Sequence, residues 1–120
     1  MKKVLVVDDS EVNLYLFRSA FRNDPDISVE IETDSTVALS KILNTHPDIL
    51  VLDIMMPDLN GLDLLKQIKS DPEISEIPVI INSALQEDSS VEEAMNMGAR
   101  EYIMKPVEFD TIRSVIMKYV

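Results

Sequence analysis

The feature that most constrains this chain is the alternation of short apolar runs with amphipathic stretches. The runs are rich in valine and isoleucine and too short for helices, and they occupy residues 3–7, 28–31, 49–54, 79–82 and 102–104. Apolar residues at spacings of three and four indicate helices near residues 12–21, 39–43, 62–68, 91–95 and 109–119. Strand–helix alternation with short connections favours a parallel, doubly wound sheet. No linker or repeat interrupts the pattern, so we predict one α/β domain over residues 1–120.

The same spacing predicts which helix faces are buried and where helices end. In the first helical stretch we expect Val12, Leu16 and Ala20 to form the buried stripe, widened by two phenylalanines. Ser89 opens a capping box of the form Ser-x-x-Glu, which predicts the start of the fourth helix. Gly98 is placed to close that helix.

Composition and charge exclude several classes of site. The chain has 11 basic and 22 acidic residues, a net charge of −11, which argues against direct nucleic-acid binding by this domain. The absence of cysteine excludes disulfides and thiolate metal sites, so a metal would need oxygen ligands or His46, which we expect on the surface. No apolar run approaches the roughly 18 residues of a membrane span. The amino-terminal run ends at Asp8, too early for a signal peptide, so we expect a cytoplasmic protein without membrane contact.

The acidic residues of interest lie where the predicted strands end. In open α/β sheets, ligands bind beyond the carboxyl ends of the strands. Those ends carry Asp8 and Asp9, then Asp53, Ser83 and Lys105. Three carboxylates in a small space destabilise the fold unless cations compensate, and Lys105 supplies one positive charge. A hard divalent ion such as Mg²⁺ would supply the remainder, and an entering phosphoryl group could then be neutralised while a carboxylate attacks it.

Four segments in order along the chain resemble the receiver domains of bacterial response regulators. They read VLVVDDS at residues 4–10, LVLDIMMPDLNG at 50–61, PVIINSA at 78–84 and GAREYIMKP at 98–106. The resemblance covers the whole chain and implies a flavodoxin-like fold. That fold is a five-stranded parallel sheet of order 2-1-3-4-5 with five helices in three α/β/α layers.

The resemblance also implies a phosphorylation site. Asp53 would accept a phosphoryl group from a phosphohistidine on a histidine kinase or a histidine phosphotransfer protein. Asp9, Asp53 and the backbone carbonyl of Met55 would ligate Mg²⁺, for which Mn²⁺ could substitute, and Asp8 would act mainly through a bound water. Such a domain is no conventional enzyme, because it catalyses only its own phosphorylation and dephosphorylation.

The remaining implied residues report the phosphorylated state. Ser83 and Lys105 would bind the phosphoryl oxygens, and Tyr102 resembles the aromatic switch residue that moves inward when Ser83 moves toward the phosphate. The fourth helix, fifth strand and fifth helix would then change and control an output partner or domain. Two residues depart from the usual pattern: Ser83 replaces threonine and keeps the hydroxyl, and Asn82 is more polar than usual.

Two other functions fit the sequence less well. An aspartate-nucleophile, Mg²⁺-dependent phosphatase of the haloacid dehalogenase type needs a second aspartate two residues after the nucleophile, where this chain has Met55. A pseudo-receiver that only binds a partner would lack an acid, the hydroxyl or the lysine, and all are present. The sequence leaves open whether the chain is a stand-alone regulator, a phosphorelay intermediate or the amino-terminal domain of a longer protein.

Overall fold

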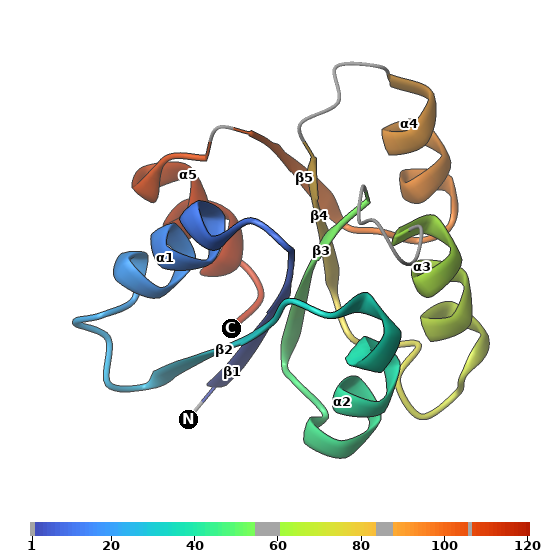
Figure 1. The fold of residues 1–120 in the computed structure, drawn as a ribbon, viewed down its shortest axis with the longest axis horizontal. Helices are drawn as coiled ribbons and strands as arrows, with labels where there is room; N and C mark the ends of the chain where they lie inside the picture. The colour runs from blue at the N-terminus through green and yellow to red at the C-terminus, as the bar shows by residue number, and fades with distance from the viewer. Residues whose placement is uncertain (1, 55–60, 84–87, 106) are drawn as a thin grey trace.

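The predicted sheet is present in the computed structural model, which describes residues 2–54, 61–83, 88–105 and 107–120. Its strands are β1 (Lys2–Val7), β2 (Ile27–Glu32), β3 (Ile49–Asp53), β4 (Val79–Ser83) and β5 (Glu101–Met104). The strands pair in parallel in the order β2-β1-β3-β4-β5 (Figure 1). The expected α/β fold and strand order are confirmed.

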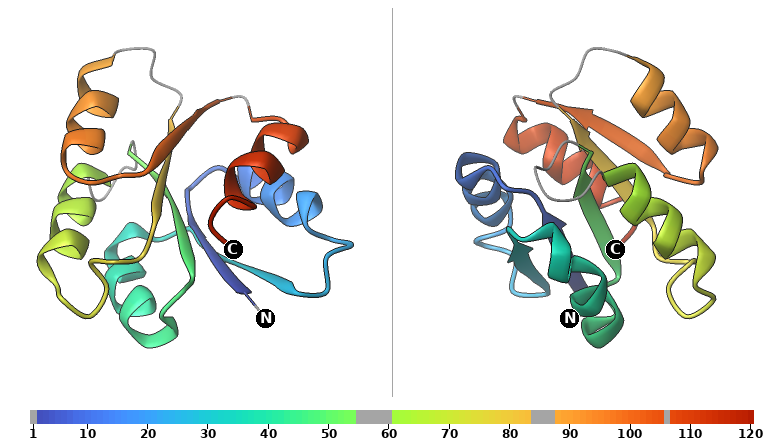
Figure 2. Two further views of the ribbon diagram at one scale, coloured as in Figure 1. Left: turned by 180° about the vertical axis from the view of Figure 1, so that it is seen from behind. Right: turned by 45° about the vertical axis from the view of Figure 1, so that its right-hand side comes forward.

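The helices cover both faces of this sheet and complete three layers. They are α1 (Glu11–Ala20), α2 (Ala38–Thr45, after the short 3-10 helix Ser35–Val37), α3 (Gly61–Ser70), α4 (Asp88–Asn96) and α5 (Phe109–Ile116). Helices α1 and α5 lie on one face, and α2, α3 and α4 lie on the other (Figure 2). In the part of the chain that the structure describes, no helix is long and apolar enough to cross a bilayer.

The strand side chains alternate between two hydrophobic clusters, one on each face. On β1, Val4 and Val6 pack with α1 and α5, whereas Leu5 and Val7 pack with the helices of the opposite face. All five residues of β3 are buried. Burial on both faces explains why the runs read as continuously apolar, and it holds the carboxyl ends of these strands in fixed positions.

The predicted buried stripe of α1 was wrong at Val12, which is 70% exposed, and Leu16 is only half-buried. Ala20 and the two phenylalanines, Phe17 and Phe21, are buried as predicted, and Leu14 joins them in the core. The spacing of apolar residues cannot identify Asn13 as buried. Its side chain lies in the interior, where it donates a hydrogen bond to Asp8.

The two predicted ends of α4 had different outcomes. Gly98 follows the helix with a φ of 111° and donates its backbone N–H to Met95, so the predicted closure is confirmed. The helix begins at Asp88 and includes Ser89. The side chain of Ser89 lies outside the described residues, so the predicted capping box stays a prediction.

Glu101, at the start of β5, holds the carboxyl-terminal end of the chain against the sheet. Its carboxylate accepts hydrogen bonds from the Tyr119 hydroxyl at 2.6 Å and from Lys118 Nζ at 3.0 Å. These bonds, the Tyr119 bond first, lower the pKa of Glu101. A lowered pKa adds stability above the unfolded-state pKa, and this stability is lost as pH falls through the folded-state pKa.

We expect the free energy of unfolding of Glu101→Gln to depend less on pH in the acid range than that of wild type. Wild-type stability should fall more steeply than that of the variant below about pH 4.5, and the variant should cost up to about 1 kcal/mol at neutral pH. Urea unfolding from pH 7 to pH 3 measures both. Glu93→Gln, at an exposed position of α4, is the control. Parallel curves for wild type and Glu101→Gln would contradict this role.

Candidate functional site

The carboxyl ends of two neighbouring strands, β1 and β3, bring the predicted acidic residues together. Val7 pairs with Leu52, and Asp53 pairs with Asn82, so Asp8 and Asp53 lie at the same level of the sheet. One carboxylate oxygen each from Asp8, Asp9 and Asp53 lies within 4.8 Å of the others. Asp8 and Asp53 are 0% and 2% exposed, whereas Asp9 is exposed. The site is therefore a buried carboxylate pair with one acid open to solvent.

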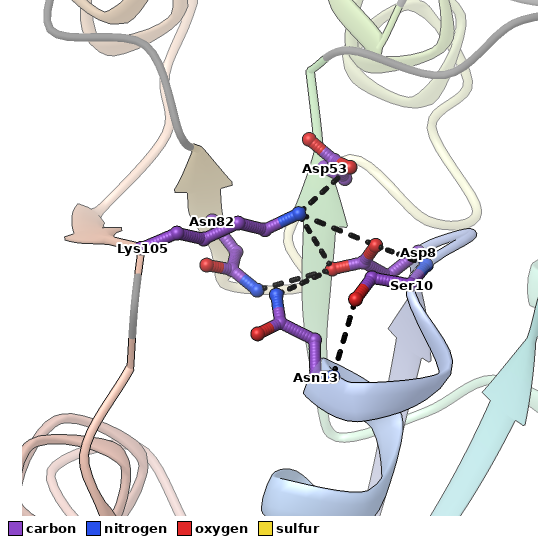
Figure 3. Close-up of polar contacts among 6 residues, drawn as sticks. All are labelled: Asp8, Ser10, Asn13, Asp53, Asn82 and Lys105. Atoms are coloured by element: carbon purple, nitrogen blue, oxygen red, sulfur yellow. Dashed lines mark hydrogen bonds and ion pairs between the residues drawn. The ribbon is translucent and has the colours of Figure 1, made fainter.

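Lys105 follows β5 and joins the two buried carboxylates (Figure 3). Its Nζ lies 3.2 Å from Asp8 Oδ2 and 3.1 Å from Asp53 Oδ2. Burial opposes the charged ammonium, but the carboxylates of Asp8 and Asp53 outweigh burial and raise the pKa of Lys105. Lys105 is therefore a firmly protonated cation that neutralises part of the acidic cluster.

Asp8 is also held by donors that sequence reasoning did not assign. Its Oδ2 accepts from Asn13 Nδ2 at 2.9 Å and from Asn82 Nδ2 at 3.3 Å. Its Oδ1 accepts from the backbone N–H of Ser10 at 2.9 Å. The available signals were an asparagine on the buried face of an amphipathic helix and another inside an apolar strand, because buried amides need partners.

Local structure brings Asn13 into this position. Ser10 is the N-cap of α1, and its Oγ accepts from the backbone N–H of Asn13 at 3.3 Å. Only residues 8–10 separate β1 from α1, and the first turn of the helix lies beside Asp8. Ser10 thus satisfies one of the free backbone N–H groups in the first turn of α1.

Gly61 supports the strand that carries Asp53. Its backbone N–H donates to the carbonyl of Ile54 at 2.8 Å. A Cβ at this glycine would lie 2.4 Å from the backbone oxygen of Asp53 and 2.6 Å from the Cα of Ile54. The first residue of α3 therefore approaches the end of β3 too closely for any side chain.

Four other residues considered in the sequence analysis have different outcomes. Met55 and the side chain of Ser83 lie outside the described residues, although the backbone of Ser83 ends β4 opposite Met104. Tyr102 is 50% exposed on β5, not in the core. His46 is exposed at the end of α2, in the loop that leads to the amino end of β3, as expected for a surface residue.

Comparisons with known proteins agree with this arrangement. The family model for the response regulator receiver domain matches residues 4–117. Protein PilH of Pseudomonas aeruginosa is 32% identical over 117 residues, covering 97% of this chain and 95% of PilH. The polar-differentiation response regulator DivK of Brucella ovis is 30% identical over 118 residues, covering 98% of this chain and 95% of DivK.

A solved structure shows the same fold at lower identity. The chemotaxis protein CheY4 of Vibrio cholerae superposes with a TM-score of 0.88 at 23% identity, covering 100% of this chain and 99% of that one. The matched family model and the two relatives span the sheet, the acidic cluster and Lys105. The chain belongs to the response regulator receiver domains of two-component signalling.

Proposed function

We propose that this chain is one receiver domain over residues 1–120 that accepts a phosphoryl group on Asp53 and acts in the cytoplasm as a switch. The observation that carries the proposal is the cluster itself. A nearly buried Asp53 lies within reach of two further carboxylates and 3.1 Å from the ammonium of Lys105. A carboxylate nucleophile, a lysine ammonium and oxygen ligands for a metal therefore lie together at one edge of the sheet.

The donor set fits a hard divalent cation. Its carboxylates supply only oxygen ligands, and Mg²⁺ favours a few such oxygens together with retained waters. We assign direct ligation to Asp9, Asp53 and the backbone carbonyl of Met55, and a water-mediated contact to Asp8. Mn²⁺ shares the preference for oxygen and should substitute. When bound, the ion would neutralise the oxygens of the entering phosphoryl group.

The residues of the chain supply the remaining chemistry. A carboxylate oxygen of Asp53 attacks the phosphorus of a phosphohistidine, the phosphorus–nitrogen bond breaks, and its electron pair remains with the imidazole. Lys105, already charged beside Asp53, stabilises the negative oxygens of the transferred group. Ser83 donates its hydroxyl to the same oxygens. The acceptor is consumed once per phosphorylation, so the domain is a signalling module and not a conventional enzyme.

The switch would act through the surface of α4, β5 and α5. Phosphorylation adds up to about two negative charges to the site, which favours movement of Ser83 and Lys105 toward the phosphoryl group. Tyr102, now half exposed, would then turn inward. A histidine kinase or histidine phosphotransfer protein would supply the phosphoryl group, and an output partner or domain would read the changed surface. Direct nucleic-acid binding is not part of this proposal, given the net charge of −11.

Incubation with acetyl phosphate and MgCl₂, followed by intact-protein mass spectrometry, tests the proposal. We expect one added phosphoryl group per chain, formed only with the metal and released by hydroxylamine, as an acyl phosphate requires. Equal labelling in excess EDTA, or a product resistant to hydroxylamine, would contradict it. Beryllofluoride with Mg²⁺ should independently shift the backbone amide resonances of β5 and α5.

Replacing Lys105 with methionine should destabilise the chain most when no metal is bound. The variant leaves the buried carboxylates of Asp8 and Asp53 without their shared cation, at a cost of about 1–2 kcal/mol. Mg²⁺ should narrow the difference from wild type, because it supplies positive charge to the same acids. Thermal unfolding in EDTA and in MgCl₂ measures both effects, with exposed Lys66→Met as the control. If the stability difference between wild type and Lys105→Met were the same in EDTA and in MgCl₂, Lys105 and Mg²⁺ would not neutralise the same carboxylates.

A further inference from the structure

Asn82 is a buried polar residue whose position core packing does not explain. Its side chain is 0% exposed at the end of β4, on the same face as the apolar Ile80. Its Oδ1 has no hydrogen-bond partner among the residues that the structure describes. A buried acceptor without a partner costs free energy, and an apolar side chain would avoid that cost. The benefit of Asn82 must therefore come from its other amide atom.

That atom, Nδ2, is directed at Asp8. It lies 3.3 Å from Asp8 Oδ2, and Figure 3 shows the side chain of Asn82 pointing toward that carboxylate. A carboxylate only accepts hydrogen bonds, so the amide cannot be reversed without placing Oδ1 against Oδ2. The carboxylate of Asp8 therefore requires that Nδ2 of Asn82, and not Oδ1, faces it.

Asn13 repeats this arrangement from another element. Its Nδ2 donates to the same Oδ2 at 2.9 Å, and it too is buried, at 5% exposure. With the backbone N–H of Ser10 on Oδ1, Asp8 has three donors that do not depend on Lys105. They come from the turn before α1, from α1 itself and from β4, so Asp8 is held from two sides.

We propose that Asn13 and Asn82 form an amide clamp, two side-chain donors on Asp8 Oδ2 that hold this carboxylate oriented toward Mg²⁺ when Lys105 moves to the phosphoryl group. The inference rests on the metal site proposed above. Lys105 now divides its contacts between Asp8 and Asp53, and a phosphoryl group on Asp53 would draw it away from Asp8. The clamp retains partners for the carboxylate that loses the cation. Both asparagines are positioning residues, because they act through Asp8.

The clamp also joins the metal side of the site to the switch strand. Asn82 immediately precedes Ser83 in β4, 74 residues along the chain from Asp8. A displacement of this strand end on phosphorylation would therefore change the Asn82 contact with Asp8. The metal affinity and the switch would be linked through one amide.

The test compares Asn82→Val with Asn44→Val, which makes the same change at an exposed site of α2. Isothermal titration with MgCl₂ gives the Kd, and urea unfolding in EDTA gives the metal-free stability. For Asn82→Val we expect about tenfold weaker Mg²⁺ binding, as is usual when an outer partner of a metal site is lost. We expect no loss of metal-free stability, because Oδ1, which has no partner in the described part of the chain, is removed with the amide. Asn44→Val should bind Mg²⁺ like wild type.

The outcomes separate this inference from the proposed function. Absence of Mg²⁺ binding by wild type would contradict the metal site itself and the clamp with it. Wild-type binding together with an unchanged Kd in Asn82→Val would overturn the clamp alone, whatever happens to stability. If Asn82→Val does not fold, Asn13→Leu on α1 decides by the same titration. An unchanged Kd there would equally overturn the clamp, and a weaker one would support it.

Discussion

The Asp53→Asn variant is expected to fold normally and to take up no phosphoryl group from acetyl phosphate and Mg²⁺. An amide has nearly the shape of the carboxylate but is a far weaker nucleophile, so the geometry survives while the attacking oxygen is lost. The variant also removes one negative charge from a buried cluster, which should leave the metal-free protein at least as stable as wild type. Intact mass spectrometry measures uptake, and urea unfolding measures stability.

A matched substitution tests whether position 53 is special. Asp63→Asn makes the same chemical change in the exposed first turn of α3, and it should be phosphorylated like wild type. If Asp53→Asn were phosphorylated at the wild-type rate, the acceptor would have to be a residue other than Asp53. Asp9 would then be the first to examine, because it is the exposed member of the cluster.

Gly61→Ala should cause the largest loss of stability among single-methyl additions at the site. The new Cβ would lie 2.4 Å from the backbone oxygen of Asp53, and a backbone atom cannot rotate away as a flexible side chain can. Either α3 or the end of β3 must shift, at a cost of about 3 kcal/mol or more. Phosphorylation should fall as well, because the strand that carries Asp53 is displaced.

Gly98→Ala is the appropriate comparison for this substitution. Its φ of 111° is unfavourable for alanine, but the nearest atom to the new Cβ is Cε of the flexible Lys69 side chain at 3.3 Å. We expect a cost of about 1 kcal/mol from backbone conformation and unchanged phosphorylation. Urea unfolding of both variants measures the difference. A smaller loss for Gly61→Ala than for Gly98→Ala would mean that the contact between α3 and β3 is easily relieved.

The sheet and the acidic cluster could be predicted because both depend on the order of elements along the chain. Continuous burial of β3 makes its sequence apolar from end to end, so the strand is readable without its neighbours. Once the strands are parallel, their carboxyl ends must meet at one edge. Asp8, Asp53 and Lys105 therefore come together even though 97 residues separate the first from the last.

The outward position of Val12 on α1 and the partners of Asp8 could not be predicted in the same way. They depend on single side-chain contacts between elements, such as the bond from Asn82 to Asp8 across 74 residues. Apolar spacing favoured Val12 for the buried face of α1, although that residue is 70% exposed. A buried asparagine gains its position from a specific acceptor, and periodicity carries no information about that acceptor.

The connection of Lys105 to Asp8 has a consequence for biosynthesis. The site draws on the first strand and on the residue that follows the last one, so a partial chain lacks it until residue 105 has been added. The proposed phosphorylation site is thus completed in one step, when β5 joins the sheet. We expect a chain in which that edge of the sheet is still open to take up no phosphoryl group.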